Sequence, residues 1–169
     1  NINTGAGTDT INITSGTYAG DTLNGGADSD TLAITGGGIV NISTGVTVSN
    51  IENVSIDATA TTFTANNDAL AITAGNGGNT ITLGSGTQSV TAGTGADTVN
   101  LGSGNNNVNT GGGSDTVNGT VAVGDVVDLD AGSDSFAYQT LAGDVRGGTG
   151  TDTITIATGL GPVSLNLNV

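Results

Sequence analysis

Apolar residues recur at every ninth position through most of this chain, and this repeat constrains the fold more than any other feature of the sequence. The series has eight members between positions 54 and 117, and after one extra residue it continues with five more. Its members are Val54, Phe63, Ile72, Ile81, Val90, Val99, Val108, Val117, Val127, Phe136, Val145, Ile154 and Val163. A short fixed period of this kind is typical of a solenoid, because one repeat cannot bury its apolar face unless a neighbour stacks on it.

A second period of about eighteen residues is superimposed on the first. Two positions before alternate members of the series, the residues are Asn79, Asp97, Asp115, Asp134 and Asp152, at steps of 18, 18, 19 and 18. The intervening members have Gln88, Asn106, Asp125 and Gly143 at the same place. Two nine-residue units therefore make one coil, with one edge rich in Asp and the other mixed. We expect an all-β fold, a right-handed parallel β-roll or β-helix solenoid of about 18 residues per coil and roughly nine coils.

Glycine recurs in phase with the apolar residues, at the positions six and four before many of them. In the unit that ends at Val99 these are Gly93 and Gly95. Glycine permits a positive φ and a close approach of one backbone to another. Each unit therefore predicts a tight turn followed by a three-residue strand, in which the Val or Ile points inward and its neighbours point outward.

The repeat is strict in residues 63–169 and irregular in residues 1–62, and we expect both parts to belong to a single solenoid domain of residues 1–169. Residues 36–62 are more apolar and rich in β-branched side chains, which predicts longer strands and fewer ion-binding turns. Glu52 in this segment is interpreted as a solvated strand residue. Residues 119–130 form a second irregular patch with one inserted residue.

The composition leaves little material for a conventional core. The chain has 169 residues, among them 31 Gly, two Tyr and two Phe, with no Trp and no Met. A core built from Val, Ile and Leu on a glycine-rich frame must be thin and regular. The fold therefore needs another source of stability.

The charge indicates what that source is. Fifteen acidic residues and one basic residue, Arg146, give a formal net charge of −14. This balance excludes a nucleic acid as partner, because phosphate binding requires Lys and Arg, and it disfavours an anionic membrane surface. No apolar segment is long enough for a transmembrane helix, so we expect no membrane insertion. Concentrated carboxylates repel each other unless cations lie between them.

Three segments match the spacing of the nonapeptide pattern G-G-x-G-x-D-x-U-x, in which U is an apolar residue. They end at Val99, where Ala92 replaces the first Gly, at Val117 and at Ile154. Units of the same character end at Ile11 and Leu32. In these segments the chain resembles the calcium-binding repeats of repeats-in-toxin (RTX) proteins, as in bacterial surface-layer proteins and adhesins. The resemblance covers residues 72–155 closely and residues 1–35 less closely.

In the family that the chain resembles, each calcium ion is held between adjacent turns by backbone carbonyls and Asp side chains. The resemblance therefore implies Ca²⁺ as the cofactor, with ligands at Asp9, Asp28, Asp30, Asn79, Gly93, Gly95, Asp97, Gly111, Gly113, Asp115, Asp125, Asp130, Asp134, Gly148, Gly150 and Asp152. This set suits Ca²⁺, which takes six to eight hard oxygen ligands, and glycine turns leave their carbonyls accessible. Gln88, Asn106 and Gly143 carry no charge, so we expect weak binding or none at their turns. The alternative is that Asp and Asn occur here only because tight turns favour them.

Outward-facing positions form a second regular array. Thr80, Thr98, Thr116, Ser135 and Thr153 precede the apolar residues of the Asp-rich edge, and Thr82, Asn100, Asn118, Ala137 and Thr155 follow them. Some ice-binding solenoids present ranks of Thr in this way. However, β-branched Thr suits any exposed strand position, and the Asn and Ala interruptions favour this structural explanation.

Catalysis is not expected. The chain has no His, Cys or Lys, so the usual pairs of nucleophile and base cannot be built. Paired carboxylates can hydrolyse glycosidic bonds, but the Asp residues here follow a structural period and do not mark a single cleft. We therefore expect that the chain is not an enzyme.

These patterns together favour a calcium-stabilised structural protein, secreted to the bacterial cell surface and loose or disordered until it meets calcium. We expect a subunit of a surface layer or of a self-assembling filament, in which copies of the chain stack end to end, because neither end of the sequence has polar capping residues. The alternative is an ice- or carbohydrate-binding segment of a larger secreted RTX adhesin. Its partner would then be ice or a carbohydrate.

Overall fold

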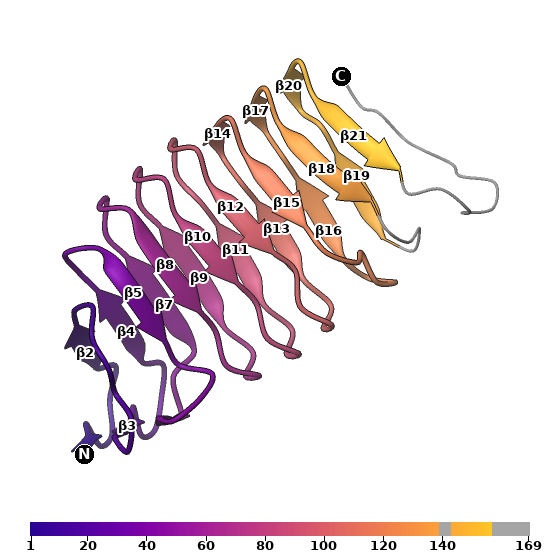
Figure 1. The fold of residues 1–169 in the computed structure, drawn as a ribbon. Helices are drawn as coiled ribbons and strands as arrows, with labels where there is room; N and C mark the ends of the chain where they lie inside the picture. The colour runs from indigo at the N-terminus through magenta and orange to yellow at the C-terminus, as the bar shows by residue number, and fades with distance from the viewer. Residues whose placement is uncertain (139–142, 157–169) are drawn as a thin grey trace.

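The computed structural model describes residues 1–138 and 143–156. These residues wind into an elongated solenoid, in which two long parallel sheets run side by side along the axis (Figure 1). The described residues contain no helix, and therefore none that could cross a membrane. The all-β class and the parallel solenoid that the repeat predicts are confirmed.

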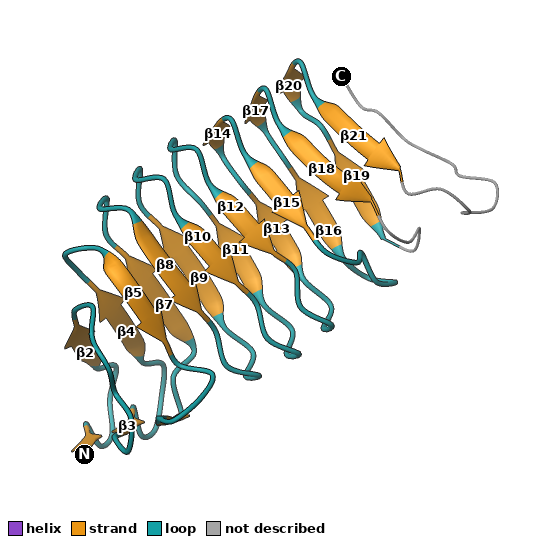
Figure 2. Cartoon of the chain, in the orientation of Figure 1, coloured by secondary structure: helices purple, strands orange, loops and turns teal. Residues whose placement is uncertain are grey.

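The two long sheets have eight and seven strands, drawn in orange in Figure 2. The eight-stranded sheet contains β2 (Thr10–Ile13), β4 (Thr31–Ile34), β7 (Asn53–Ile56), β9 (Ala71–Ala74), β11 (Ser89–Thr91), β13 (Asn107–Asn109), β16 (Val126–Asp128) and β19 (Asp144–Arg146). The seven-stranded sheet contains β5 (Gly38–Asn41), β8 (Thr61–Thr64), β10 (Thr80–Thr82), β12 (Thr98–Asn100), β15 (Thr116–Asn118), β18 (Ser135–Tyr138) and β21 (Thr153–Ile156). The chain alternates between the sheets, which makes one coil from two short strands and two turns over most of the length.

Two further sheets of three short strands lie towards opposite ends of the molecule. β1 (Ile2–Asn3), β3 (Thr22–Asn24) and β6 (Thr47–Ser49) form the first. β14 (Gly112–Gly113), β17 (Ala131–Gly132) and β20 (Thr149–Gly150) form the second. The first sheet gives the N-terminal coils an additional side, and the second lies within the turns that lead into the seven-stranded sheet.

Strand pairing explains why the repeat fails near the N-terminus. Thr10 pairs with Thr31, Thr31 with Asn53, and Asn53 with Ala71, so the steps are 21, 22 and then 18 residues. The longer steps supply the strands of the additional side. The described residues form about eight turns at roughly 18 residues per coil, one fewer than expected. The expectation of roughly nine coils was for the whole chain, and Val163, the last member of the series, lies outside the described residues.

The nine-residue series forms the core of both sheets. Val54 pairs with Ile72 in the eight-stranded sheet, and Phe63 pairs with Ile81 in the seven-stranded sheet. From Val54 to Val145 every member is at most 5% exposed, whereas Ile154 is only partly buried. The nine-residue period is therefore half a coil, because consecutive members belong alternately to the two facing sheets.

The central turns require glycine because the turns of adjacent coils stack closely, and not because glycine permits a positive φ. A side chain at Gly102 would place its Cβ 1.6 Å from the carbonyl oxygen of Gly84 in the preceding coil. The backbone of Gly93 and Gly95 stays outside the left-handed region, so this turn uses the close approach that glycine permits and not the positive φ. In the next turn along the edge, by contrast, Gly111 and Gly113 have φ values of 79° and 150°.

Candidate metal centres

The acidic residues of one edge form a hydrogen-bonded ladder. This Asp edge consists of Asn79, Asp97, Asp115, Asp134 and Asp152, each immediately before a strand of the seven-stranded sheet. Each carboxylate reaches back one coil, where its Oδ1 accepts a hydrogen bond from the backbone N–H of the equivalent residue. The N···Oδ1 distances are 2.6 Å for Asn79 to Asp97, 2.8 Å for Asp97 to Asp115, 2.8 Å for Asp115 to Asp134 and 3.1 Å for Asp134 to Asp152.

The second oxygen of these carboxylates is buried without a partner. Asp97, Asp115 and Asp134 are only 1–2% exposed, and the Oδ2 atom of each accepts no hydrogen bond. Among the described residues Asp9 and Asp30 have the same buried, unpartnered Oδ2. Leaving a buried acceptor unsatisfied costs about 1–3 kcal/mol, and more when it is charged. Five atoms of one kind in this state mark positions where a hydrogen-bond donor or a cation would be stabilising.

The turn of Asn79 shows how a side-chain amide fills the same place. Its Oδ1 accepts the backbone bond from Thr61 as the Asp residues do for their neighbours, and its Nδ2 donates to the carbonyls of Gly75 and Gly77 at 3.1 and 2.6 Å. The register of β10 with β12 puts Asp97 at the equivalent place in the next coil. An Asp turn thus has an oxygen where the Asn turn has two hydrogens, and oxygen cannot donate to carbonyls.

The carboxylates fold back over the glycines of their own turns. A Cβ on Gly147 would lie 2.7 Å from Oδ2 of Asp152, and a Cβ on Gly132 would lie 2.7 Å from Oδ1 of Asp134. Carboxylate and backbone oxygens therefore line the same small turn. Among the described residues no three acidic side chains converge on one point, so a cation here would combine one or two carboxylates with carbonyls, a donor set of hard oxygens that suits Ca²⁺.

The titration of the ladder reflects the same environment. Burial raises the pKa of Asp97, Asp115 and Asp134 above the usual aspartate value, because the charged form loses its hydration. The carboxylate of Asp115 raises the pKa of Asp97 and Asp134 further, while bonds from backbone N–H groups act in the opposite direction. Burial is the largest effect on the pKa of all three.

The opposite, mixed edge precedes the eight-stranded sheet and has a different character along its length. Its successive positions are Asp9, Asp30, Glu52, Leu70, Gln88, Asn106, Asp125 and Gly143. At its middle, Gln88 Nε2 donates to the carbonyls of Asn66 and Asp68 at 3.0 and 2.9 Å, and Asn106 Nδ2 donates to the carbonyl of Gly104 at 3.0 Å. Side-chain amides thus satisfy backbone carbonyls of these turns.

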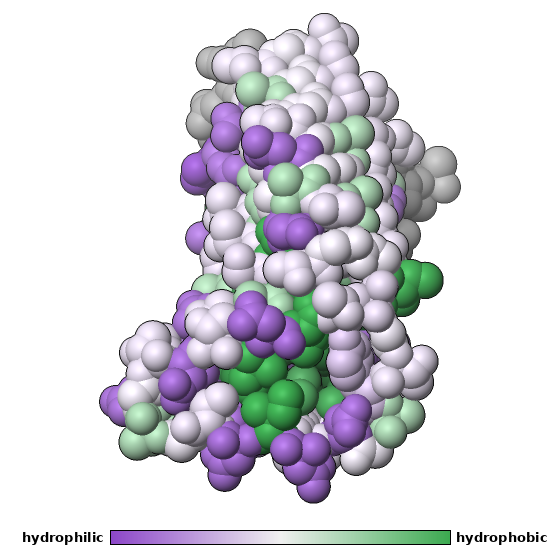
Figure 3. All heavy atoms as spheres, turned by 90° about the vertical axis from the view of Figure 1, so that its left-hand side faces the viewer, coloured by the Kyte–Doolittle hydropathy of each residue, from purple (hydrophilic) through white to green (hydrophobic). Residues whose placement is uncertain are grey.

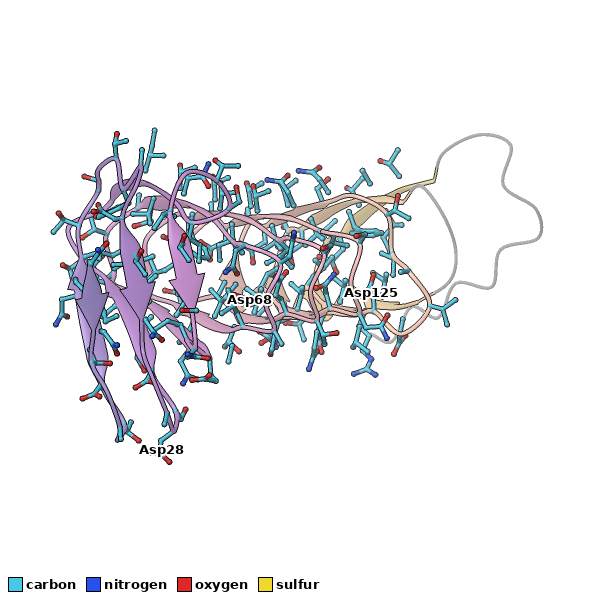
Figure 4. The ribbon with its side chains drawn as sticks, turned by 90° about the horizontal axis from the view of Figure 1, so that it is seen from below. Asp28, Asp68 and Asp125 are labelled. Carbon is cyan, nitrogen blue, oxygen red and sulfur yellow. The ribbon has the colours of Figure 1, made fainter. Side chains whose placement is uncertain are left out.

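Several of the predicted ligands are less suited to a cation. Both oxygens of Asp125 already accept backbone hydrogen bonds, from Asn106 and Ala122. Asp28 and Asp130 are exposed, with positive φ values of 78° and 63°, and Asp28 points away from the body of the solenoid at the tip of a turn (Figure 4). Both ends of the Asn79 amide are engaged in hydrogen bonds, so Asn79 offers less to a cation than the Asp residues of the same edge.

The remaining predicted residues lie in the turns of the Asp edge. The carbonyls of Gly93 and Gly111 each accept a hydrogen bond from the next coil, at 2.9 Å, and a carbonyl oxygen has a second lone pair for a cation. Gly148 and Gly150 repeat this turn with positive φ. Sequence reasoning left the edge of Asp9 and Asp30 unassigned, because the steps of 21 and 22 residues hide their register, and it missed that Glu52 continues their series.

Comparisons of the chain with family models, with curated proteins and with solved structures found no match.

Proposed function

We propose that this chain is a calcium-stabilised structural protein of the cell exterior, secreted to the bacterial surface. One observation carries the proposal: the buried Oδ2 atoms of the Asp edge take the place at which the amide of Asn79 donates two hydrogen bonds. A cation supplies positive charge there, as the amide does in the neighbouring coil. Asp97, Asp115 and Asp134, with the carbonyls of their turns, are the residues that would hold it.

The stacking of the coils makes a cation necessary along this edge. Neighbouring parallel strands lie about 4.8 Å apart, so the carboxylates of successive coils approach to a similar distance. Like charges so close repel by about 1 kcal/mol per pair in bulk water, and by about 3–4 kcal/mol at the effective dielectric constant near a protein surface. Calcium reaches concentrations outside cells that fill sites with dissociation constants of about 10⁻⁴–10⁻³ M. Calcium sites of this affinity therefore suit a protein that is secreted before it becomes rigid.

A structural role follows from how the candidate sites are distributed. They repeat along the axis on two edges, and within the described part of the chain they form no group of three or more acidic side chains that could meet a substrate together. Their common effect is to join each coil to the next. Rigidity along the axis is the property that a surface layer or a filament requires of its subunits.

Self-assembly is supported by the surface of the first coil. Figure 3 shows apolar atoms gathered at this end of the solenoid, within a rim of hydrophilic residues. Ile2 is 42% exposed there, and it borders a hollow together with Ile13, Tyr18 and Leu23. The strands β1 and β2 also have an unpaired edge on this side. In a filament the last coil of a second copy covers this surface, and in a longer adhesin a further coil of the same chain covers it.

An ice- or carbohydrate-binding segment of an RTX-like adhesin is the second candidate. The register places Thr80, Thr98 and Thr116 in one straight rank on the outer face of the seven-stranded sheet. In the parallel rank, however, Asn118 Nδ2 donates to Asn100 Oδ1 at 3.2 Å, and Asn100 Nδ2 donates to Thr82 Oγ1 at 3.1 Å. Because these groups bond to each other along the axis, the array also has a purely structural use, and the structural role remains our first proposal.

A calcium titration followed by far-ultraviolet circular dichroism tests the metal. We expect β-structure to appear as calcium is added to the chelated chain, and the response to weaken in the double variant Asp97→Ala with Asp115→Ala. Electron microscopy with calcium, and again with chelator, tests the assembly. Filaments or lattices with calcium support the subunit role, and dispersed particles under both conditions leave the adhesin segment, for which ice-growth inhibition is then measured.

A further inference from the structure

A second group of oxygens lies on the mixed edge, where the wide N-terminal coils meet the regular ones. It comprises Asp30, Asn50 and Glu52, next to Gly25. These residues are on the opposite side of the coil from the Asp edge. Asn50 and Glu52 fall outside the nonapeptide pattern, so their arrangement is visible only in the fold.

Asp30 is the buried member of the group. It is 1% exposed, its Oδ1 accepts the backbone N–H of Asp9 at 2.8 Å, and its Oδ2 is buried without a partner. The absence of a side chain at Gly25 leaves a space beside this atom. A Cβ on Gly25 would lie 2.5 Å from Oδ2 of Asp30 and 2.1 Å from the carbonyl oxygen of Asn50. A carboxylate oxygen and a carbonyl oxygen therefore border the same space.

The backbone of Asn50 is set in an unusual conformation at this point. Its φ is 53°, in the left-handed region that few residues other than glycine adopt. Its side chain donates to Oδ1 of Asn24 at 2.8 Å, and the neighbouring carbonyl of Ser49 accepts the N–H of Gly25 at 3.2 Å. These bonds hold the segment against the preceding coil, with the Asn50 carbonyl beside the carboxylate of Asp30.

Glu52 supplies a second carboxylate from the next coil. Its Oε2 accepts the backbone N–H of Asp30 at 2.9 Å, as Asp115 does for Asp97 on the other edge. The expectation of a solvated strand residue is thus incomplete, since Glu52 is exposed but precedes β7 and bonds to the neighbouring coil. It also lines an open groove with Leu70 and Gln88, so this carboxylate is accessible from solvent.

No basic side chain neutralises this pair. Arg146 is the single basic residue of the chain, and it belongs to β19, where it contacts Asp144 at 2.7 Å and Asp128 at 3.9 Å. Two carboxylates on successive steps of one hydrogen-bonded edge, one of them with a buried oxygen that has no partner, therefore lack a basic side chain.

We propose that Asp30 and Glu52, with the carbonyl of Asn50, form a further site for a divalent cation, of the kind that calcium fills, between the second and third coils. The choice of calcium rests on the proposed function, whereas the position of the site rests on the contacts above. Bound there, the cation joins the wide coils to the regular coils at their 22-residue step.

The test uses the intact chain and the variant Glu52→Gln. Glutamine keeps an oxygen that can accept the N–H of Asp30, so the coil keeps its hydrogen bond and loses only the charge. Asp68→Asn is the matched control, because Asp68 is an exposed carboxylate in a turn further along the same edge (Figure 4). Hydrogen exchange is measured by mass spectrometry at increasing concentrations of calcium chloride, starting from chelated protein.

We expect Glu52→Gln to raise the calcium concentration that protects residues 22–34 and 47–56 by about tenfold or more, because a charged ligand is lost. Protection of residues 93–136 should follow calcium as in the unmodified chain, and the control should match the unmodified chain throughout. Asp30→Asn should protect residues 22–34 without calcium, because its amide can donate to the Asn50 carbonyl as Asn79 donates in its own turn.

An unchanged calcium midpoint at residues 22–34 in Glu52→Gln would overturn this site. Full protection of these residues in the chelated unmodified chain would overturn it as well. In either case a calcium response at residues 93–136 leaves the proposed function standing. If calcium changes protection at neither edge, the proposed function fails together with this site.

Discussion

At one position of the Asp edge, the difference between Asn and Asp decides whether the side chain completes the hydrogen bonds of its turn. Asn79 and Asp97 occupy equivalent places and accept the same backbone bond with Oδ1. They differ only in the second atom of the side-chain head, which is a donor in Asn79 and a buried, unpartnered oxygen in Asp97. The protein therefore contains its own control for what a positive partner does in these turns.

Asp115→Asn should make the chain more stable in chelator and less responsive to calcium. The amide keeps Oδ1 for the N–H of Asp97 and gives the turn carbonyls two donors, so we expect a gain of about 1–3 kcal/mol in the free energy of unfolding without calcium. Urea denaturation in chelator and in calcium measures both effects. Asp115→Ala removes the acceptor as well and should lower stability under both conditions, and a loss of stability in chelator for Asp115→Asn would contradict the account.

Gly102→Ala should be much more costly than Gly112→Ala. A Cβ at Gly102 lies 1.6 Å from a backbone oxygen of the adjacent coil, and backbone cannot move aside without separating the coils. Overpacking of this kind costs at least about 1–3 kcal/mol. At Gly112 the nearest atoms are 3.7 Å away or more and φ is not positive, so its substitution should change thermal stability little. Equal melting temperatures for the two variants would show that close stacking of the turns is not what requires glycine.

At the scale of the coil, the sequence predicts the regular part of the fold well. Two-residue alternation around Val99 and Val117 gives short strands, and the nine-residue spacing gives the register, because every coil from β9 to β15 advances by the same eighteen residues. The nine-residue period does not predict the N-terminal coils, because their steps of 21 and 22 residues add a third side.

The candidate site is predictable to a similar extent, and for the same reason. The Asp edge follows from the period, but the unpartnered Oδ2 atoms and the full satisfaction of Asp125 depend on hydrogen bonds that no spacing encodes. The sequence does not indicate that Glu52 stacks on Asp30, because the step between them is a coil of 22 residues. The left-handed conformation of Asn50 likewise has no clear signal in the sequence.

The coils of the Asp edge should respond to pH in opposite ways with and without calcium. Burial raises the pKa of Asp97, Asp115 and Asp134 above 3.8, so the folded chain holds more protons than the unfolded chain between 3.8 and the raised values. In chelator, stability is therefore highest below pH 3.8 and decreases as pH rises through this window. Calcium binds the deprotonated form, so in its presence stability should rise with pH.

Urea denaturation between pH 3.5 and 7 measures both curves. Asp57 acts in the opposite direction, because backbone hydrogen bonds from Gly36 and Thr59 lower its pKa, but it is exposed and its effect should be small. A stability in chelator that increases steadily across this range would show that the buried carboxylates are not destabilised by their charge.

The stability of the whole molecule depends on contacts between neighbouring coils. The core consists of rows of mainly Val, Ile and Leu side chains along the sheets, and every coil contacts mainly its two neighbours. Turns completed by amides occupy the middle of the mixed edge, while unpartnered carboxylates lie at the N-terminal end of that edge and along most of the Asp edge. Calcium outside the cell would then fix a chain that is loose within it, which is the behaviour expected of a secreted structural solenoid.

Anomalous diffraction from crystals grown in calcium tests the central claim most directly, because it locates the ions themselves. The account predicts anomalous peaks between consecutive turns of the Asp edge, within about 2.3–2.6 Å of the Oδ2 atoms of Asp97, Asp115 and Asp134. Ordered carboxylates at these three residues with no peak beside them, in crystals saturated with calcium, would contradict it.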